Sequence, residues 1–352
     1  MRVAVLGAGV IGLSVAWRCA RRGMEVTVHD PAPARAAANV AAGMLAPVTE
    51  LHAGEEALLA LNLESARRWP SFAAELAGDA GCDPGYVTCG TVAVARDLDD
   101  LRVLDDLHAQ QVGLGLQVER LSGREVRRRE PALAPSARGG LFVGGDHQVD
   151  NRRLLSALRR AAGARAVGMV TTSPEDPPAM RALDADAVVV AAGWRSPALV
   201  PGLAVRPVKG QVLRLRSDGR SVLPAHVVRG LDVYVVPRGD EVVVGATVED
   251  VGEDLTVRAG AVHDLLHDAA DLVPGVAEAE LVECGVGLRP ATPDNAPLIG
   301  ALDERTVVAT GHYRNGILLA PVTADAVAEL LVSGEAPDVV APFRPERPAV
   351  RR

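Results

Sequence analysis

The sequence predicts an α/β protein, with a parallel, doubly wound sheet joined to a second, α+β region that has a mixed or antiparallel sheet. The chain opens with a strand, a glycine-rich turn, a helix and a second strand within its first 30 residues. The apolar run at 187–192 is typical of a strand buried on both faces of a parallel sheet. By contrast, residues 205–248 are typical of strands and turns alone, which indicates antiparallel sheet.

Length and charge narrow the class of protein. The chain has 352 residues, enough for about two domains. Its apolar runs are too short to span a bilayer, and its apolar N-terminus is expected to be a strand rather than a signal peptide. A formal net charge of −8 argues against nucleic acid or an anionic membrane as the main partner. The four cysteines lack C-x-x-C spacing, which favours free thiols and a cytoplasmic location, and Lys209 is the only lysine.

The first element is a strand that runs into the pattern G-x-G-x-x-G. Gly7 is expected to make the tight turn, Gly9 to let the backbone approach a pyrophosphate, and Gly12 to let the following helix pack closely on the strand. The start of that helix then offers N–H groups and positive dipole density to phosphates. A glycine turn without a ligand is the alternative, and the strand–turn–helix–strand context disfavours it.

The second strand, at 25–29, ends in Asp30. An acid at this distance from the glycine turn can accept hydrogen bonds from the adenosine ribose, and it would repel a 2′-phosphate. The residues therefore predict an adenine dinucleotide other than NADP, and they leave both NAD and FAD open.

Further elements follow from periodicity and turn residues. In order they are a loop or helix start at 39–47, a helix at 58–76, a strand at 85–96, a helix at 97–112, a strand at 140–149, a helix at 151–162, a proline-rich loop at 173–178, strands at 211–215, 233–237 and 241–246, a helix at 256–272, a strand at 306–311 and a helix at 316–333. Pro321 is tolerated only near the first turn of the last helix, which favours a start near Gly316.

This alternation predicts a cofactor domain built from three separated chain segments, with a second domain inserted twice. The predicted segments are 1–80, 147–208 and 286–352 for the cofactor domain, and 81–146 and 209–285 for the substrate domain.

Several motifs, in order and spacing, resemble those of one family. The matching stretches are 7–12, 41–47, 207–211, 234–238, 243–247, 287–290 with 297–300, and 311–321. Through them the chain resembles the FAD-dependent amine and amino-acid oxidases of the D-amino-acid oxidase superfamily, and within it the glycine oxidases of thiamine biosynthesis.

The resemblance implies a Rossmann-type, GR2-like FAD-binding domain with non-covalent FAD. It implies that Arg289 grips a substrate carboxylate, that Tyr234 adds its hydroxyl to that grip, and that Arg314 lies at the pocket edge beside the flavin. The residues expected to contact FAD are Gly7, Gly9, Val10, Ile11, Gly12, Asp30, Pro31, Arg35, Ala42, Gly43, Met44, Val167, Gly193, His312, Tyr313, Asn315, Gly316, Ile317 and Leu318.

The chain departs from the family pattern in three places. Residues 31–41 are nearly all alanine and proline, with Arg35 and Asn39 as the only side-chain donors. The stretch between 165 and 187 is shorter than usual, so the adenine contact is assigned to Val167 by position alone. No cysteine follows Cys284, which leaves a covalent flavin unsupported on the C-terminal side.

The implied reaction is oxidation of glycine, or of small amines and D-amino acids, to the imine by hydride transfer from Cα to flavin N5, with O2 reduced to H2O2. An arginine suits this task because its planar fork binds a carboxylate bidentately. Binding the amine in its neutral form removes the need for a dedicated base. The start of the helix at 316–333 is expected to stabilise negative charge on the reduced flavin. The imine is expected to supply a thiazole synthase, and assembly into a homo-oligomer is left open.

Alternatives remain at this point. From the residues alone, Arg289 fits an ion pair at the edge of the core, Tyr234 fits a packing aromatic, and Arg314 in a glycine-flanked turn is the better functional candidate. His263 and His267 lie four residues apart, but a solvated helix face is favoured over a metal site. The rival functions are a D-amino-acid dehydrogenase, a sarcosine or proline oxidase, a non-catalytic FAD-binding protein and, least favoured, an NAD dehydrogenase.

Overall fold

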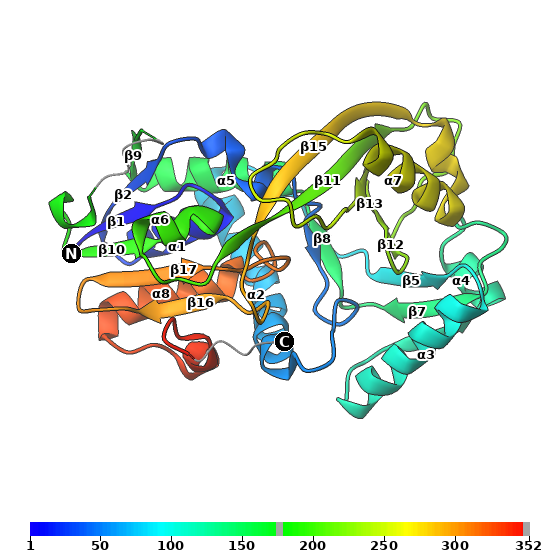
Figure 1. Cartoon of the computed structure of the whole chain (residues 1–352), viewed down its shortest axis with the longest axis horizontal. Coiled ribbons are helices and arrows are strands. Elements are labelled where there is room, and N and C mark those ends of the chain that lie inside the picture. Colours follow the sequence, from blue (N-terminus) through cyan, green and yellow to red (C-terminus); the bar gives the residue numbers. More distant parts are fainter. Residues whose placement is uncertain (174–178, 348–352) are drawn as a thin grey trace.

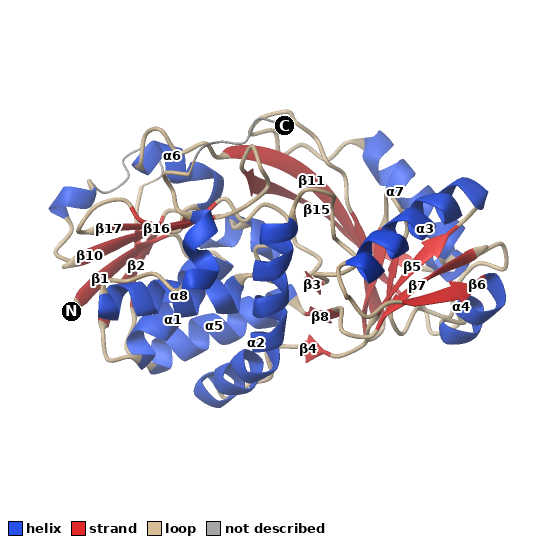
Figure 2. Cartoon of the chain, turned by 90° about the horizontal axis from the view of Figure 1, so that it is seen from below, coloured by secondary structure: helices blue, strands red, loops and turns tan. Residues whose placement is uncertain are grey.

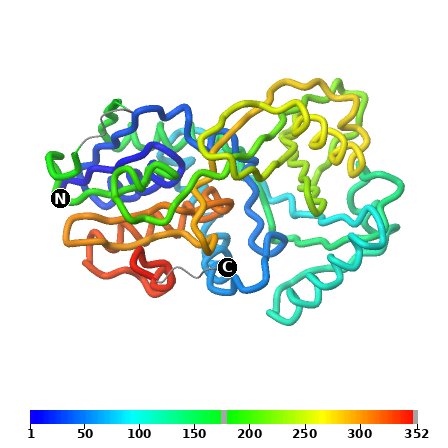
Figure 3. Tube along the Cα trace, in the orientation of Figure 1, coloured from blue at the N-terminus to red at the C-terminus, as the bar shows by residue number. Residues whose placement is uncertain are grey.

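The computed structural model describes residues 1–173 and 179–347, and its secondary structure falls into two halves. Figure 1 shows one half with a helix-covered parallel sheet and another with a large, curved sheet. Figure 3 shows that the N-terminal (blue) and C-terminal (orange to red) segments lie in the same half. No helix within the described ranges is both long and apolar enough to cross a membrane.

The strands are β1 (Arg2–Leu6), β2 (Glu25–Asp30), β3 (Met44–Leu45), β4 (Tyr86–Val87), β5 (Thr91–Ala95), β6 (Glu119–Ser122), β7 (Gly139–Val143), β8 (His147–Val149), β9 (Gly168–Thr171), β10 (Ala187–Val190), β11 (Arg206–Arg216), β12 (Val227–Arg229), β13 (Tyr234–Arg238), β14 (Glu241–Gly245), β15 (Glu280–Ala291), β16 (Leu298–Ala301) and β17 (Thr306–Thr310). The α-helices are α1 (Val10–Arg21), α2 (Glu56–Ala80), α3 (Leu98–Gly113), α4 (Gly123–Arg129), α5 (Asn151–Ala164), α6 (Ser196–Leu199), α7 (Ala259–Leu272) and α8 (Ala320–Ser333).

The first sheet has the strand order β16-β17-β10-β1-β2-β9, and all its pairs are parallel except β16 with β17. The central strands β1 and β10 pair through apolar residues that are almost fully buried. This confirms the predicted α/β class and the buried strand at 187–192. The order is not sequential, so the segments that carry β1, β10 and β17 must meet in space.

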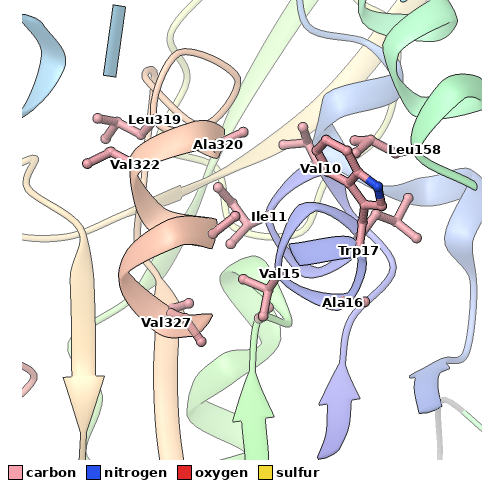
Figure 4. Packing of buried hydrophobic residues seen from close by; sticks show 14 of the residues in the cluster. Val10, Ile11, Val15, Ala16, Trp17, Leu158, Leu319, Ala320, Val322 and Val327 are labelled. Carbon is pink, nitrogen blue, oxygen red and sulfur yellow. The ribbon is translucent and has the colours of Figure 1, made fainter. Parts of the chain in front are cut away.

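Helices α1, α2, α5 and α8 form the main core on one face of this sheet. Figure 4 shows Ile11 and Val15 of α1 facing α8, whereas Val10 and Trp17 lie on the side of Leu158 of α5. Trp17 also meets Phe72 of α2 edge-on, at 5.1 Å between ring centroids. These contacts fix the N-terminus of α1 relative to the start of α8.

The second sheet has the order β15-β11-β14-β13-β12-β5-β7-β6 and is antiparallel except for β12 with β5. Its apolar face packs against α7 and α4, and α3 covers β5 and β7. Strands β11 and β15 are paired along their whole length, and Figure 2 shows them bridging the two halves. The small sheet β3-β8-β4 lies between the halves.

The structure corrects several predicted elements. The strand expected at 85–96 is two strands, β4 and β5, in different sheets, because the chain turns at Gly90 with φ +73°. The strand expected at 140–149 is likewise β7 and β8, separated by a turn. Helix α7 begins at Ala259, after residue 256. Helix α8 begins at Ala320, and turns occupy Gly316–Leu319. Residues 174–178 of the predicted proline-rich loop lie outside the described residues.

The predicted division into domains stays a proposal. The two sheets draw on chain segments close to those predicted, but the expected boundaries at 208/209 and 285/286 fall inside β11 and β15.

Candidate active site

A cavity of about 870 Å³ lies where the two halves meet. Its walls come from the turn after β1, parts of 29–44, the segment around Gly193, strands β11, β13 and β15, and parts of 309–317. Ligand pockets measure about 300–1,000 Å³, so this cavity is large enough for a cofactor and a small substrate. It opens at the carboxyl ends of the parallel strands, where α/β proteins bind ligands.

One end of the cavity is built from backbone. Gly7 has φ +116°, and a Cβ there would lie 2.3 Å from the carbonyl oxygen of Ala191. A Cβ on Gly12 would lie only 1.8 Å from the carbonyl oxygen of Gly7. No side chain caps the start of α1 at Gly9, and its first turn has no acidic residue. This end therefore offers N–H groups and the positive helix dipole to an anion, as a pyrophosphate requires.

Asp30 holds this end in shape and supplies its negative charge. Its Oδ2 accepts a hydrogen bond of 2.6 Å from the N–H of Ala8, and its Oδ1 accepts one of 2.7 Å from the N–H of Ala32. Both loops that border the expected ribose position are thereby tied to one carboxylate, which suits ribose hydroxyls and disfavours a 2′-phosphate.

The loop carrying Ala42, Gly43 and Met44 is also fixed by backbone contacts. Gly43 has φ +80°, and its carbonyl oxygen accepts a 2.8 Å bond from the N–H of Val149. Arg238 donates to the carbonyl oxygens of Ala42 and Val149. Burial lowers the pKa of Arg238 to about 10, so it is still a cation at neutral pH. All three residues line the cavity, and none of them has a hydrogen-bonding side chain to offer a cofactor.

The other end of the cavity carries the predicted substrate residues. Arg289 extends from β15, and its Nη1 donates to the carbonyl oxygens of Lys209 at 3.2 Å and Thr247 at 3.0 Å. The guanidinium lies over Gly210, where a Cβ would come within 2.2 Å of Nη1. Tyr234 of β13 lies beside Arg289. Burial raises the pKa of Tyr234 although the Arg289 cation opposes the shift, so its hydroxyl is protonated.

Arg314 belongs to a charged cluster that includes residues the sequence analysis missed. Its Nη1 donates to His52 Nε2 at 2.6 Å, and its Nη2 lies 3.8 Å from Glu55. Burial, reinforced by Arg314, lowers the pKa of His52, so the ring is a neutral acceptor. Glu50 pairs with Arg229 at 2.6 Å, and the Arg229 and Arg314 cations lower the pKa of Glu50 against the effect of burial. Glu50, His52 and Arg229 line the cavity.

A sequence signal for two of these residues existed. Glu50 and His52 follow directly after the motif at 41–47. Arg229 lies on β12 outside every quoted motif, and only the pairing of β12 with β13 brings it beside Tyr234.

The segment before α8 closes the cavity. Tyr313 has φ +45° and donates its N–H to the carbonyl oxygen of Pro290 at 2.9 Å. His312 is buried, its Nε2 lies 3.0 Å from Thr323 Oγ1, and burial lowers its pKa to about 3, so it is neutral. Ser65 and Trp69 of α2 both donate to the carbonyl oxygen of Leu318. Gly316 and Ile317 thus face the cavity from a fixed turn.

Most predicted site residues meet at this one cavity. Those that line it are Gly7, Gly9, Val10, Ile11, Asp30, Pro31, Arg35, Ala42, Gly43, Met44, Gly193, Tyr234, Arg289, His312, Tyr313, Arg314, Gly316 and Ile317. Four do not line it. Gly12 lies beneath the turn, Asn315 and Leu318 are buried behind Gly316, and Val167 belongs to the main core. Thr172 and Ser173 line the cavity further along the chain from Val167.

The histidine pair singled out in the sequence lies away from the cavity. His263 and His267 are exposed on α7, with ring centroids 6.1 Å apart. Among residues 1–173 and 179–347, no group of three or more His, Cys, Asp or Glu side chains is arranged to hold a metal ion.

A turn of free backbone N–H groups beside an acid, joined in one cavity to an arginine–tyrosine pair, is the arrangement expected of a dinucleotide-dependent oxidoreductase. Residues 2–330 match the DAO family, described as FAD dependent oxidoreductase, and the chain belongs to this family. The resemblance seen in the sequence is thereby confirmed, and FAD is the dinucleotide. The backbone cradle at Gly7–Gly12, Asp30 and residues 42–44 fits that cofactor.

Known proteins resemble this chain in both sequence and structure. The chain is 35% identical to the glycine oxidase of Geobacillus kaustophilus, over 97% of this chain and 95% of that protein. A crystal structure of glycine oxidase from the same organism superposes with a TM-score of 0.90 at 34% identity and covers 99% of both chains. The bifunctional protein ThiO/ThiG of Trichormus variabilis is 32% identical over 98% of this chain, which spans 55% of that longer protein.

Proposed function

We propose that this FAD-dependent oxidoreductase oxidises glycine, and small amines or D-amino acids related to it, to the corresponding imine. The observation that supports the proposal is the Arg289–Tyr234 pair, which faces the same cavity as the dinucleotide cradle. A carboxylate held by this pair points the rest of a small amino acid into the space between the two. The names of the glycine oxidases that this chain resembles support the same substrate.

In this proposal Arg289 binds the substrate carboxylate and the protonated Tyr234 hydroxyl donates to one of its oxygens. These two contacts fix the direction of Cα relative to the cofactor. Holding two reacting atoms close together and correctly oriented can supply much of an enzyme's rate enhancement. Bound FAD supplies the acceptor for the Cα hydride, and O2 then takes the two electrons and two protons to give H2O2. When the amine binds in its neutral form, loss of the Cα hydride leaves a protonated imine. This releases one N–H proton to water, so the chain needs no dedicated base.

We further propose that the product from glycine, iminoacetate, supplies the synthesis of the thiamine thiazole in the cytoplasm. In Trichormus variabilis the ThiO and ThiG names belong to a single polypeptide, which supports direct transfer to a thiazole synthase. An imine hydrolyses readily in water, to glyoxylate in this case, so a nearby consuming enzyme would preserve it.

The test is a visible spectrum of the purified protein before and after glycine is added without oxygen. We expect a yellow protein whose flavin absorbance bleaches with glycine and returns when air is admitted, with H2O2 formed. A protein that stays colourless after reconstitution with FAD would overturn the proposal. Bleaching rates with glycine, sarcosine, D-alanine and D-proline then rank the substrates, and slow reaction with O2 but fast reduction of a dye would indicate a dehydrogenase.

A further inference from the structure

Lys209 is the only lysine of the chain, and it is fully buried. Its Nζ lies 3.1 Å from Asp254 Oδ2 and 3.3 Å from Glu249 Oε2, and both acids are about one-quarter exposed. A buried ammonium without such partners would be strongly destabilising. The two acids belong to one segment, the connection from β14 to α7, so Lys209 ties that segment to β11.

The tied segment forms part of the cavity wall. Thr247, Val248 and Glu253 line the cavity. Lys209 and Glu249 exchange backbone hydrogen bonds of 2.9 and 3.0 Å, and Glu249 Oε1 accepts from Gln211 Nε2 at 2.7 Å and from Thr247 Oγ1 at 2.6 Å. These hydrogen bonds and the Lys209 cation lower the pKa of Glu249 although burial acts in the opposite direction. Glu249 is therefore an ionised centre on which Thr247 and Lys209 converge.

The same two residues seat Arg289. Its Nη1 donates to the carbonyl oxygens of Lys209, which belongs to the Lys209–Glu249 bridge, and of Thr247, which lies two residues before Glu249. A guanidinium has more N–H groups than these two bonds use, so the rest can serve Tyr234 and a carboxylate. The direction of the fork is thus set by two carbonyl groups, whose separation depends on the β14–α7 segment staying against β11.

We propose that Lys209 is a positioning residue whose ion pairs with Glu249 and Asp254 fix the carbonyl seat of Arg289 and thereby set the affinity for the substrate carboxylate. This inference rests on the proposed function, in which Arg289 binds that carboxylate. Without the Lys209 cation, Glu249 and Asp254 lose their shared counter-charge. The segment that carries the Thr247 carbonyl is then held to β11 by the backbone bridge and the Gln211 contacts alone. Arg289 then keeps its charge, but its seat is less rigid.

The experiment compares holoenzyme variants Lys209→Met and Lys209→Arg with the control Asp250→Asn. Asp250 lies on the same segment, but its pair with Arg206 is exposed on both sides. The probe is sodium acetate, a carboxylate without an amine, titrated against the visible spectrum of the bound flavin. Kinetics with glycine, FAD content and melting temperature are measured alongside.

We expect Lys209→Met to raise the Kd for acetate and the KM for glycine by about tenfold, with a smaller change in kcat and with FAD retained. Lys209→Arg should restore part of the acetate affinity, and Asp250→Asn should match the parent protein. If Lys209→Met does not fold, Glu249→Gln is measured in its place and should weaken acetate binding in the same way.

Arg289→Ala separates this inference from the proposed function. If Arg289→Ala leaves acetate binding unchanged, the proposed grip on the carboxylate is wrong. If Arg289→Ala weakens acetate binding but folded Lys209→Met or Glu249→Gln leaves the Kd within twofold, the positioning role of Lys209 is wrong and the proposed function stands.

Discussion

The two ends of the cavity are built from different materials. The dinucleotide end uses backbone N–H groups, glycines without room for a Cβ and a single acid, Asp30. The substrate end uses charged side chains from separate elements. Arg289, Arg314 and Glu50 are each held by a partner there, namely the Lys209 carbonyl oxygen, His52 and Arg229. A backbone site tolerates almost no added atom, whereas a side-chain site can lose one group and keep its shape. Substitutions at the two ends should therefore have different effects: loss of FAD binding at the dinucleotide end, and weaker substrate binding with FAD retained at the substrate end.

The largest expected effect is at the dinucleotide end. Gly12→Ala places a methyl group 1.8 Å from the carbonyl oxygen of Gly7, and neither strand β1 nor helix α1 can move aside. We expect protein that binds no FAD and is therefore colourless, as judged by its visible spectrum after reconstitution. Gly78→Ala is the matched control, because nothing lies within 4 Å of that position on α2. It should stay yellow and gain up to about 1 kcal/mol of stability.

The next effect is at the substrate end, where loss of a side chain should spare the cofactor. Arg289→Ala removes a charge-assisted grip worth about 4 kcal/mol, so kcat/KM for glycine should fall by about a thousandfold. FAD content should be unchanged, because Arg289 is bonded to the backbone of Lys209 and Thr247 rather than to the dinucleotide cradle. Stopped-flow reduction by glycine measures the effect, and loss of FAD in this variant would contradict the separation of the two ends.

A smaller effect is expected at Glu50, which sequence reasoning missed. Glu50→Gln leaves the Arg229 cation without its 2.6 Å carboxylate partner beside the substrate position. Without that partner, Arg229 should shift and disturb Tyr234, which faces it on the neighbouring strand and holds the substrate carboxylate in the proposed function. KM should therefore rise by about tenfold, with little change in kcat. Glu119→Gln, which breaks an exposed pair with Arg129, is the control and should leave steady-state kinetics unchanged. An unchanged KM in Glu50→Gln would show that this cluster does not act on the substrate.

The smallest effect concerns the dependence of stability on pH, to which two buried groups, His312 and Asp146, contribute opposite slopes. Burial lowers the pKa of His312 to about 3, so the unfolded chain binds more protons than the folded chain below pH 6.5, and stability is lost as pH falls from about 6.5 toward 3. Burial raises the pKa of Asp146 to about 7, so its stabilising contribution is present below about 3.8 and is lost as pH rises through 7.

Melting temperatures at pH 5 and pH 7.5 test this pair of slopes. The melting temperature of His312→Asn, relative to that of the parent protein, should be higher at pH 5 than at pH 7.5. The relative melting temperature of Asp146→Asn should be higher at pH 7.5 than at pH 5. Each group can contribute up to about 1.4 kcal/mol per pH unit between its two pKa values. Equal differences at both pH values would show that these groups titrate in the folded chain as they do in the unfolded chain.

The contrast between local backbone features and contacts of distant residues also explains which parts of the fold could be predicted from the sequence. The strand–turn–helix start and the buried run at 187–192 depend on near neighbours in the sequence, and both were predicted correctly. The breaks between β4 and β5 and between β7 and β8 were not, because Gly90 turns the chain where it meets Phe142, a residue about 50 positions away. Helix α8 begins later than predicted, since α2 holds the carbonyl oxygen of Leu318 in the preceding turn.

The sequence by itself determined the class of fold and the dinucleotide end, because glycine and a nearby acid act through local backbone geometry. At the substrate end, the family resemblance named Arg289, Tyr234 and Arg314, and only the tertiary structure decided which residues support them. It brought Arg229 of β12 and Glu50 together beside Tyr234, and it placed Lys209 beneath the carbonyl groups that hold Arg289. The physical reason is that a charge is stabilised by its partners in space, and the partners of Arg229, Arg314 and Lys209 lie tens to hundreds of residues away.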